Sequence, residues 1–395
     1  MIRRWLAGIA AGVLALVVLP AGAQPRTIKI GFVSTLSGGG AALGQDVLDG
    51  FNLALRHLNH RLGGLPVEVI VADDQLNPDV ARTAVDRMLR RDRVDFVTGI
   101  IFSNVLLAVG DLVFENQTFY ISPNAGPSEY AGEQCNQFFI NVAWQNDNLH
   151  EAMGHYAQLK GYETLFILAP NYPAGRDALT GFKRFYKGRV IAEVYTRLGQ
   201  LDYSAEIAQI RAARPKAVYA FYPGAMGVNF IKQYAEAGLM QQIPLLLPGF
   251  SADADVIRAV GKPMVGVFNS SHWALELFNP INRRFVEDFR RTYNRIPALY
   301  AAQGYDAALA LDHGLRAVGG DLGRKAEFRR AILLGFDTTR GRVRFNKNGY
   351  PVQNYYLRQV VELPNGEILN RLRGTIFRNH GDAYVSRCRL PDVRP

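Results

Sequence analysis

A glycine-rich loop near the amino terminus is the first stretch whose residue types suggest a chemical role. The sequence SGGG at residues 37–40 follows an apolar strand predicted over residues 28–33 and precedes an amphipathic helix whose apolar face runs from Val47 to Leu58. In open parallel sheets, ligands lie at the carboxyl ends of strands, against helix N-termini whose free N–H groups favour an anion. We therefore expect residues 37–44 to form one wall of a binding cleft.

Other residues that could do chemistry lack the neighbours that the chemistry requires. His57 and His60 lie three residues apart on a predicted helix, but no acidic ligand completes a zinc pattern. Ser37, Ser103 and Ser122 are outside any G-x-S-x-G elbow. The SGGG loop is not a clean G-x-G-x-x-G and has no Walker lysine. We therefore expect no enzyme activity, no metal site and no cofactor.

Composition and charge indicate an ordinary globular protein large enough for two lobes. The chain has 395 residues, of which 48% are hydrophobic and 20% charged, values typical of soluble domains. The formal net charge of +10 comes largely from arginines scattered along the chain, with no run of five or more. A solvated surface explains this pattern better than a nucleic-acid patch, so we expect no nucleic-acid partner.

The first 23 residues have the pattern of a cleavable signal peptide. Arg3 and Arg4 form a basic segment, residues 6–19 an apolar segment, and residues 21–23 an A-x-A cleavage site. The apolar segment is short for a spanning helix. Cleavage would leave Gln24 first, which argues against a lipid anchor on a cysteine. Export through either the general or the twin-arginine route fits these residues.

The predicted export affects how the two cysteines are interpreted. Cys135 and Cys388 are the only ones, and in an oxidising compartment two cysteines most simply form one disulfide. Two unpaired buried thiols or a catalytic cysteine are the alternatives, although no Cys–His pattern supports the second.

The remaining elements alternate between strand and helix in two similar halves. In the first half, strands are predicted over residues 28–33, 67–72, 96–101 and 119–122, with helices from residue 78 and over 105–114. In the second half, strands over 164–168, 190–195, 217–221 and 245–247 alternate with helices over 147–159, 176–186, 204–213 and 228–237. Helices over 280–293 and 301–318 follow, then strands over 343–345, 354–362 and 367–372, the last two joined by the hairpin signal PNG at residues 364–366. This order predicts an α/β fold with two lobes and several chain crossings.

Six segments, taken in order, resemble the periplasmic substrate-binding proteins of branched-chain-amino-acid type ABC importers. They read IKIGFVSTLSGGGAALGQD, GIIFSN, ISPNAGPSE, NYPAGRDALTGF, VYAFYPGAMGVNFIKQY and YAAQGYDAALAL. The resemblance covers nearly all of the chain after residue 23. It implies a type I periplasmic binding protein: two Rossmann-like lobes, three hinge crossings, a ligand held between the lobes and a periplasmic location.

The resemblance also implies a division of the chain. Crossings fall near residues 141–143, 270–272 and 347–351. The first lobe would then hold residues 24–141 and 273–347, and the second lobe residues 142–272 and 348–395.

Ligand contacts carry over from the family by position. In the first lobe they fall on Ser37, Leu43, Phe102, Ser103, Asn104, Asn124, Ala125 and Gly126. The backbone N–H groups that hold a ligand carboxylate in the family fall near Ser103 and Asn104. In the second lobe the positions are Tyr172, Tyr222 with Phe221 as the alternative, Phe250 and Ser251.

Two positions depart from the amino-acid binders of this family. Gly126 stands where a hydroxyl is common, and the sequence has Phe250 and Ser251 where an acid from the second lobe would hold the ligand's ammonium. Because a buried ammonium without a partner is costly, an aromatic or otherwise apolar carboxylate fits better than a branched-chain amino acid. Asp253 or Asp255 could still supply the missing acid.

The function that follows is capture of a small carboxylate by hinge closure and its delivery to the transmembrane subunits of an ABC permease, by a monomer. Two other classes stay open. A ligand-sensing receptor domain shares this fold but needs a membrane or kinase partner. An exported hydrolase or dehydrogenase would need a nucleophile or a cofactor loop.

Overall fold

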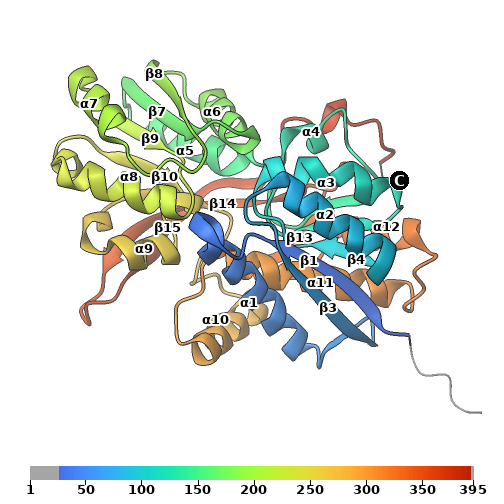
Figure 1. Cartoon of the computed structure of the whole chain (residues 1–395). Coiled ribbons are helices and arrows are strands. Elements are labelled where there is room, and N and C mark those ends of the chain that lie inside the picture. Colours follow the sequence, from blue (N-terminus) through green and yellow to red (C-terminus); the bar gives the residue numbers. More distant parts are fainter. Residues whose placement is uncertain (1–25, 393–395) are drawn as a thin grey trace, which may run out of the picture.

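A computed structural model describes residues 26–392, so the predicted signal peptide lies outside the described residues. It contains two sheets, each flanked by helices. Figure 1 shows α6, α7 and α8 gathered around β7, β8, β9 and β10, beside the part of the chain that contains α1, α2 and α3 with β1, β3 and β4. This is the predicted two-lobed α/β fold.

The first sheet has six strands in the order β2-β3-β1-β4-β5-β6, parallel except for the short β2. Its strands are β1 (Ile28–Ser34), β2 (Arg61–Leu62), β3 (Leu65–Asp73), β4 (Phe96–Thr98), β5 (Phe119–Ser122) and β6 (Phe139–Asn141). The helices between them are α1 (Ala41–His57), α2 (Pro78–Arg87), α3 (Ser103–Glu115) and α4 (Ser128–Ala131). Asn77 caps α2, and its side chain accepts a hydrogen bond from the Asp79 N–H at 2.9 Å.

The second sheet has nine strands, in the order β12-β13-β14-β11-β10-β9-β7-β8, with β15 paired to β14. Its strands are β7 (Thr164–Pro170), β8 (Arg189–Thr196), β9 (Ala217–Ala220), β10 (Leu245–Pro248), β11 (Phe268–Ser271), β12 (Phe336–Thr338), β13 (Gly341–Phe345), β14 (Pro351–Glu362) and β15 (Ile368–His380). The helices α5 (Asp147–Leu159), α6 (Pro173–Phe185), α7 (Ser204–Ala213), α8 (Ala225–Glu236) and α9 (Ala254–Val260) accompany it. The predicted hairpin at residues 364–366 joins β14 to β15.

Three helices that follow β11 return to the first sheet: α10 (Pro280–Tyr293), α11 (Leu299–Ala317) and α12 (Lys325–Leu333). α11 crosses α1 very closely. A Cβ placed at Gly50 would lie 1.8 Å from the carbonyl oxygen of Ala301, and one at Gly304 would lie 1.9 Å from that of Val47. Only glycine permits this approach, so the two glycines fix where α1 and α11 cross. β12 and β13 lie beside α11 and α12, and β13 pairs with only the first two residues of β14.

Short helical turns complete the described chain: η1 (Gly38–Gly40), η3 (Leu239–Gln241), η4 (Gly249–Ser251), η5 (Lys262–Met264) and η6 (Val385–Arg387), with a π-helical segment η2 (Met88–Asp92). Within residues 26–392, no helix is both long enough and apolar enough to cross a membrane. We call the first sheet with α1–α4, α10–α12, β12 and β13 the first lobe, and β7–β11, β14 and β15 with α5–α9 the second lobe. Residues 142–146, between β6 and α5, connect the two.

The predicted disulfide is present. Cys135, between α4 and β6, is bonded to Cys388, in the tail that follows β15, and the two Cα atoms are 5.6 Å apart. This bond joins a loop of the first lobe to a tail that leaves the second. The alternatives of free thiols or a catalytic cysteine are thereby wrong.

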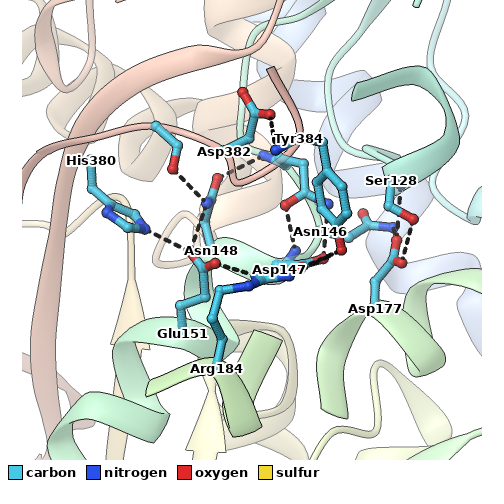
Figure 2. A network of polar contacts seen from close by, with 12 residues as sticks. Ser128, Asn146, Asp147, Asn148, Glu151, Asp177, Arg184, His380, Asp382 and Tyr384 are labelled. Atoms are coloured by element: carbon cyan, nitrogen blue, oxygen red, sulfur yellow. Dashed lines mark hydrogen bonds and ion pairs between the residues drawn. The ribbon is translucent and has the colours of Figure 1, made fainter. Parts of the chain in front are cut away.

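A partly buried polar network holds the end of β15 and the same tail against the second lobe (Figure 2). The Tyr384 hydroxyl donates to Asp147 at 2.8 Å, and Arg184 pairs with Asp147 at 2.7 Å and with Glu151. His380 contacts Glu151 at 2.6 Å. The tail is therefore anchored by side chains as well as by the disulfide.

Several element boundaries differ from those predicted, for local reasons. β4 ends at Thr98 instead of residue 101 because Gly99 has a φ of +107°, and a Cβ there would lie 2.5 Å from the carbonyl oxygen of Val33. α6 begins at Pro173 instead of residue 176, since proline at the first helical position lacks only an N–H that would be unpaired in any case. β15 runs to His380, eight residues beyond the predicted strand end, because it follows the full length of β14.

Candidate binding site

One cavity lies where strands of both sheets end. Its walls come from the loops after β4 and β5 in the first lobe, from the segment that leads from β6 into α5, from the loops after β7, β9 and β10 in the second lobe, and from the start of α11. The lining residues are Ile101, Phe102, Ser103, Asn124, Trp144, Asn146, His150, Tyr172, Ala174, Phe221, Pro223, Phe250 and Tyr300. This is the edge at which open α/β sheets bind ligands.

The floor on the first-lobe side is the N-terminus of α3. The turn at Gly99 directs the chain toward the cavity, and Phe102 stands at the N-cap with an extended backbone. Ser103 and Asn104 are the first two helical residues, and N–H groups at these positions have no partner within a helix. Together with the helix dipole, they make this end of α3 suitable for an anionic group.

Aromatic rings form most of the wall. Phe102 and Tyr172 have ring centroids 6.1 Å apart across the two lobes. Phe221 lies 6.3 Å from Tyr172 and 5.4 Å from Phe250, and Trp144 meets Phe250 edge-on at 4.3 Å. Rings at such spacings present flat apolar faces on which another ring can stack.

His150 belongs to this wall as a neutral side chain. It is 1% exposed, lies 4.9 Å from the Phe221 ring, and its Nδ1 contacts the Tyr219 hydroxyl. Burial lowers the pKa of His150 to about 3, because the charged imidazolium would lose its hydration. The ring therefore carries no charge near neutral pH and adds no cation to the cavity.

The polar groups of the cavity are few and neutral. The Asn146 Nδ2 group donates to the Ser103 hydroxyl oxygen at 3.1 Å, and the Asn124 Nδ2 group donates to Gln303 on α11 at 2.9 Å. Within residues 26–392, no Asp, Glu, Lys or Arg lines this cavity. Its electrostatic character is set by hydroxyl and N–H donors.

Neither of the two acids that could have supplied a ligand's ammonium with a partner lines the cavity. Asp253 caps α9, accepts from the Leu299 N–H at 2.6 Å and lies 3.5 Å from Arg358. Asp255 is buried outside the cavity lining, and burial raises the pKa of its carboxyl to about 7. Neither reaches the aromatic wall.

Of the predicted contact residues, Phe102, Ser103, Asn124, Tyr172 and Phe250 line the cavity. Ser37, Leu43, Asn104, Ala125, Gly126, Tyr222 and Ser251 do not.

The strand geometry explains two of these positions. Tyr222 points into the second lobe, where its ring lies 4.8 Å from Tyr203 and 5.1 Å from Phe230, so Phe221 faces the cavity. The Ser251 hydroxyl accepts from the Tyr222 N–H at 2.7 Å and fixes this choice of side.

Three further residues support the cavity from behind. The Gly126 N–H donates to Asn146 Oδ1 at 3.0 Å, and the Ala125 carbonyl accepts from the Ser122 hydroxyl at 2.6 Å. Leu43 is buried, and a Cβ at Gly224 would lie 3.5 Å from its side chain. Its contact is therefore with the facing loop of the second lobe.

Sequence reasoning missed Trp144, Asn146, His150 and Tyr300 in the lining, and also Ile101, Ala174 and Pro223. The first three lie between β6 and the second turn of α5, where the Asn141 side chain accepts from the Ala143 and Trp144 N–H groups and turns the chain into the cavity. An asparagine at the end of a short apolar run is a turn signal that could have indicated this loop. Tyr300 lies in the cavity lining only because α1 and α11 cross closely, and no local sequence pattern indicates that crossing.

The cavity is small and closed. It has a volume of about 20 Å³, close to that of one water molecule, whereas small-molecule pockets measure hundreds of Å³. A Cβ at Gly224 in the second lobe would lie 2.7 Å from the carbonyl oxygen of Gly39 in the first, so the glycine-rich loop is in contact with the opposite lobe. A ligand with an aromatic ring can enter only if the lobes or the rings move apart.

A larger cavity, of about 360 Å³, lies near α9, the start of α11 and the β14–β15 hairpin. It is away from the ends of β4, β5, β7 and β9, where open α/β sheets bind ligands. Of its three arginines, Arg295 and Arg358 are paired with aspartates, and Arg258 is in no ion pair within residues 26–392. We therefore place the functional site at the smaller cavity.

Comparison with known proteins gives consistent matches over the whole described fold. A family model described as "Periplasmic binding protein" matches residues 27–367. Leu/Ile/Val-binding protein homolog 6 of Brucella melitensis biotype 1 is 24% identical over 369 residues, which are 91% of this chain and 94% of that protein.

Two solved structures are also similar. The solute-binding protein of an ABC transporter from R. palustris, crystallised with benzoate, is 29% identical, with a TM-score of 0.86 over 92% of this chain and 100% of that one. An ABC transporter substrate-binding protein from Sphaerobacter thermophilus is 27% identical, with a TM-score of 0.83 over 90% and 99% of the two chains.

Proposed function

Because this chain belongs to the periplasmic binding protein family, we propose that it captures a small aromatic or otherwise apolar carboxylate between its lobes and delivers it to an ABC importer. The observation that carries the proposal is the aromatic-walled cavity at the N-terminus of α3, which is lined by no acidic side chain of residues 26–392. Such a site offers donors to a carboxylate and stacking faces to a ring, but nothing that would pair with an ammonium.

The proposed pose follows from the chemistry of the walls. The ligand carboxylate accepts from the N–H groups of Ser103 and Asn104 and from the Ser103 hydroxyl, at the positive end of the α3 dipole. Its apolar body lies among Phe102, Tyr172, Phe221 and Phe250. Burying an aromatic ring among these residues removes roughly 150 Å² or more of apolar surface from water, which favours the closed state by several kcal/mol.

An amino acid fits less well. Its ammonium would be buried without a carboxylate, at a cost of at least several kcal/mol. The benzoate bound to the R. palustris protein supports an aromatic acid. The name of the Brucella relative, a Leu/Ile/Val-binding protein homologue, keeps a branched-chain amino acid as the second candidate.

We also propose a lobe division, an export route, an oligomeric state and a docking partner for this chain. We divide the lobes at crossings near residues 141–143, 270–272 and 347–351, with residues 37–44 as the part of the first lobe that meets the second on closure. We propose that residues 1–23 direct export to the periplasm and are removed, and that the protein acts as a monomer. The closed form then docks on the transmembrane subunits of the permease. Differential affinity of the ligand for the closed state drives the closure.

A thermal-shift and calorimetry panel tests the ligand class. Benzoate should raise the melting temperature by several degrees, since a ligand at 100 times its Kd stabilises by about 2.7 kcal/mol. Benzamide, the neutral isostere, should give little shift because it lacks the anion. Leucine should also give little shift. A shift with leucine and none with benzoate would reject the aromatic acid and favour the second candidate.

A further inference from the structure

Asn146 is held in one orientation by three buried hydrogen bonds. Its Oδ1 accepts from the Gly126 N–H at 3.0 Å, and its Nδ2 donates to the Ser103 hydroxyl oxygen at 3.1 Å and to Asp177 Oδ2 at 3.0 Å. Its own N–H also donates to the Gly126 carbonyl at 2.8 Å. Since a backbone N–H can only donate, the amide oxygen must face Gly126 and the amide nitrogen must face Ser103.

This orientation determines what the Ser103 hydroxyl can do. Because its oxygen already accepts from Asn146, its hydrogen remains available to donate into the cavity that Ser103 lines. A hydroxyl arranged in this way prefers an acceptor such as a carboxylate oxygen. Asn146 thus sets the polarity of the one hydroxyl at the N-terminus of α3.

Asp177, in the second lobe, contacts the same Asn146 amide. It lies on α6, the helix whose first residues carry Tyr172 and Ala174 to the cavity. Besides Asn146, its carboxylate accepts from the Ser128 N–H at 3.0 Å and from the Ser128 hydroxyl at 2.7 Å (Figure 2). Ser128 opens α4 in the first lobe, so Asp177 bridges the two lobes.

The carboxylate of Asp177 depends on these contacts. It is 8% exposed, and within residues 26–392 no Lys, Arg or His forms an ion pair with it. Two donors of Ser128 in the first lobe, and the Asn146 amide in the segment between β6 and α5, take the place of a cation. Separation of the lobes would remove the two Ser128 donors together and expose the carboxylate to water.

We propose that Asp177 is a positioning residue that couples lobe closure to carboxylate recognition, by latching onto Ser128 and Asn146 and holding Asn146 against the Ser103 hydroxyl. The coupling to the ligand rests on the proposed function, whereas the latch itself does not. The Ser103 hydroxyl is then oriented to donate to the ligand only after the second lobe has closed onto the first. Closure and binding thereby become one step.

A double-mutant cycle measures the coupling, with benzoate as the probe. In the wild-type background, Ser103→Ala should raise the Kd for benzoate about tenfold, the loss of one charge-assisted hydrogen bond. Asp177→Asn alone should also raise it about tenfold, mainly through faster dissociation. If Asp177 acts through Ser103, adding Ser103→Ala to Asp177→Asn should raise the Kd by less than about threefold. Independent tenfold effects in both backgrounds would overturn the coupling.

Two variants accompany the cycle. Ser128→Ala removes one latch donor and lies outside the cavity, so it should raise the Kd in the same direction by a smaller factor. Glu236→Gln neutralises an exposed carboxylate on α8 of the same lobe and should leave the Kd unchanged. Equal effects of Glu236→Gln and Asp177→Asn would show that only net charge matters.

A measurement without ligand separates this inference from the proposed function. Distances between spin labels on α2 and α7 report lobe separation in the free protein. Asp177→Asn should move the distribution toward longer distances, and Glu236→Gln should not. An unchanged distribution in Asp177→Asn would reject the latch, whatever the protein binds. If the wild-type protein fails to bind benzoate but Asp177→Asn lengthens the distances between the spin labels, the proposed ligand class is wrong and the latch is supported.

Discussion

Phe250 stands where an acid would make the site suitable for an amino acid. Its ring lies within 4.3 Å of Trp144 and 5.4 Å of Phe221, and it is 6% exposed. Phe250→Glu should therefore weaken benzoate by about tenfold or more, equivalent to at least about 1.4 kcal/mol, because two carboxylates would share one desolvated cavity. The same variant should gain affinity for leucine, whose ammonium could pair with the new carboxylate.

Isothermal titration with both ligands checks this switch. Phe250→Leu is the matched control, since it keeps an apolar side chain and adds no charge. It should lose part of the stacking energy and gain nothing toward leucine. A Phe250→Glu protein that is folded and still prefers benzoate would contradict the placement of the ligand beside this residue.

His150 should make the free energy of unfolding depend on pH below neutrality. Its folded pKa of about 3 lies below the ordinary value of 6.5, so the unfolded chain binds one more proton between these limits. The stabilisation is complete above pH 6.5 and falls as the pH drops toward 3, by up to about 1.4 kcal/mol per pH unit. From pH 6.5 to pH 4 the loss is roughly 3 kcal/mol.

Urea unfolding at pH 4, 5, 6 and 7 measures this slope. His150→Asn keeps a polar group near Tyr219 but cannot titrate, so its slope should be smaller by up to one proton. His272, whose pKa burial also holds well below its ordinary range, contributes a slope of the same sign that remains in the variant. Identical slopes in both proteins would show that His150 is not desolvated in the folded state.

At the scale of single residues, the sequence identifies candidates but not the side on which they point. Tyr172 and Phe250 follow strands that the apolar pattern predicts, and both line the cavity. Phe221 and Tyr222 are adjacent and equally aromatic, and their choice of side depends on where β9 ends and on the hydrogen bond to Ser251. Such a contact joins residues 29 positions apart, so no local pattern could predict it.

At the scale of elements, Gly224 and the glycine-rich loop form the tightest meeting of the two lobes. Gly224→Ala would place a Cβ 2.7 Å from the carbonyl oxygen of Gly39 and should hold the lobes apart, raising the Kd for benzoate about tenfold. It would also add backbone strain of order 1–3 kcal/mol, since Gly224 has φ +60° and ψ −138°.

Gly261→Ala is the matched control for that strain. Gly261 has φ +76° and ψ −140°, nearly the same conformation, but in the described part of the chain no other residue comes within 4 Å of its Cβ position. Both variants should therefore lower the melting temperature to a similar extent, and only Gly224→Ala should weaken binding, as calorimetry would show. A similar loss of affinity in both would mean that strain, and not contact between the lobes, is responsible.

Most elements could be predicted because apolar spacing and helix caps are local. The alternation of strands and helices, the cap at Asn77 and the β14–β15 hairpin all follow from residues within a few positions of one another. The crossing of α1 and α11 does not, because it depends on Gly50 and Gly304, which lie far apart in sequence and look like ordinary helix-weakening residues. Tyr300 in the cavity is a consequence of that crossing.

At the scale of the whole molecule, the disulfide between Cys135 and Cys388 closes a loop across 253 residues. In the chain-entropy model such a bond lowers the entropy of the unfolded chain enough to stabilise the fold by about 5 kcal/mol. Adding a reductant should lower the free energy of unfolding in urea by up to this amount. Cys388→Ser should show the same loss without reductant and no further loss with it. A wild-type protein that is indifferent to reductant would show that the bond does not contribute.

The position of Cys388 has a further consequence for how the molecule is made. Cys135 is synthesised before any strand of the second sheet, whereas Cys388 follows all fifteen strands of the two sheets. The Cys135 thiol therefore stays unpaired until nearly the entire polypeptide, including Cys388, has been synthesised. A chain that stops anywhere inside the final hairpin carries a lone sulfhydryl, which a thiol-reactive dye or a quality-control oxidoreductase could recognise as the mark of an unfinished product.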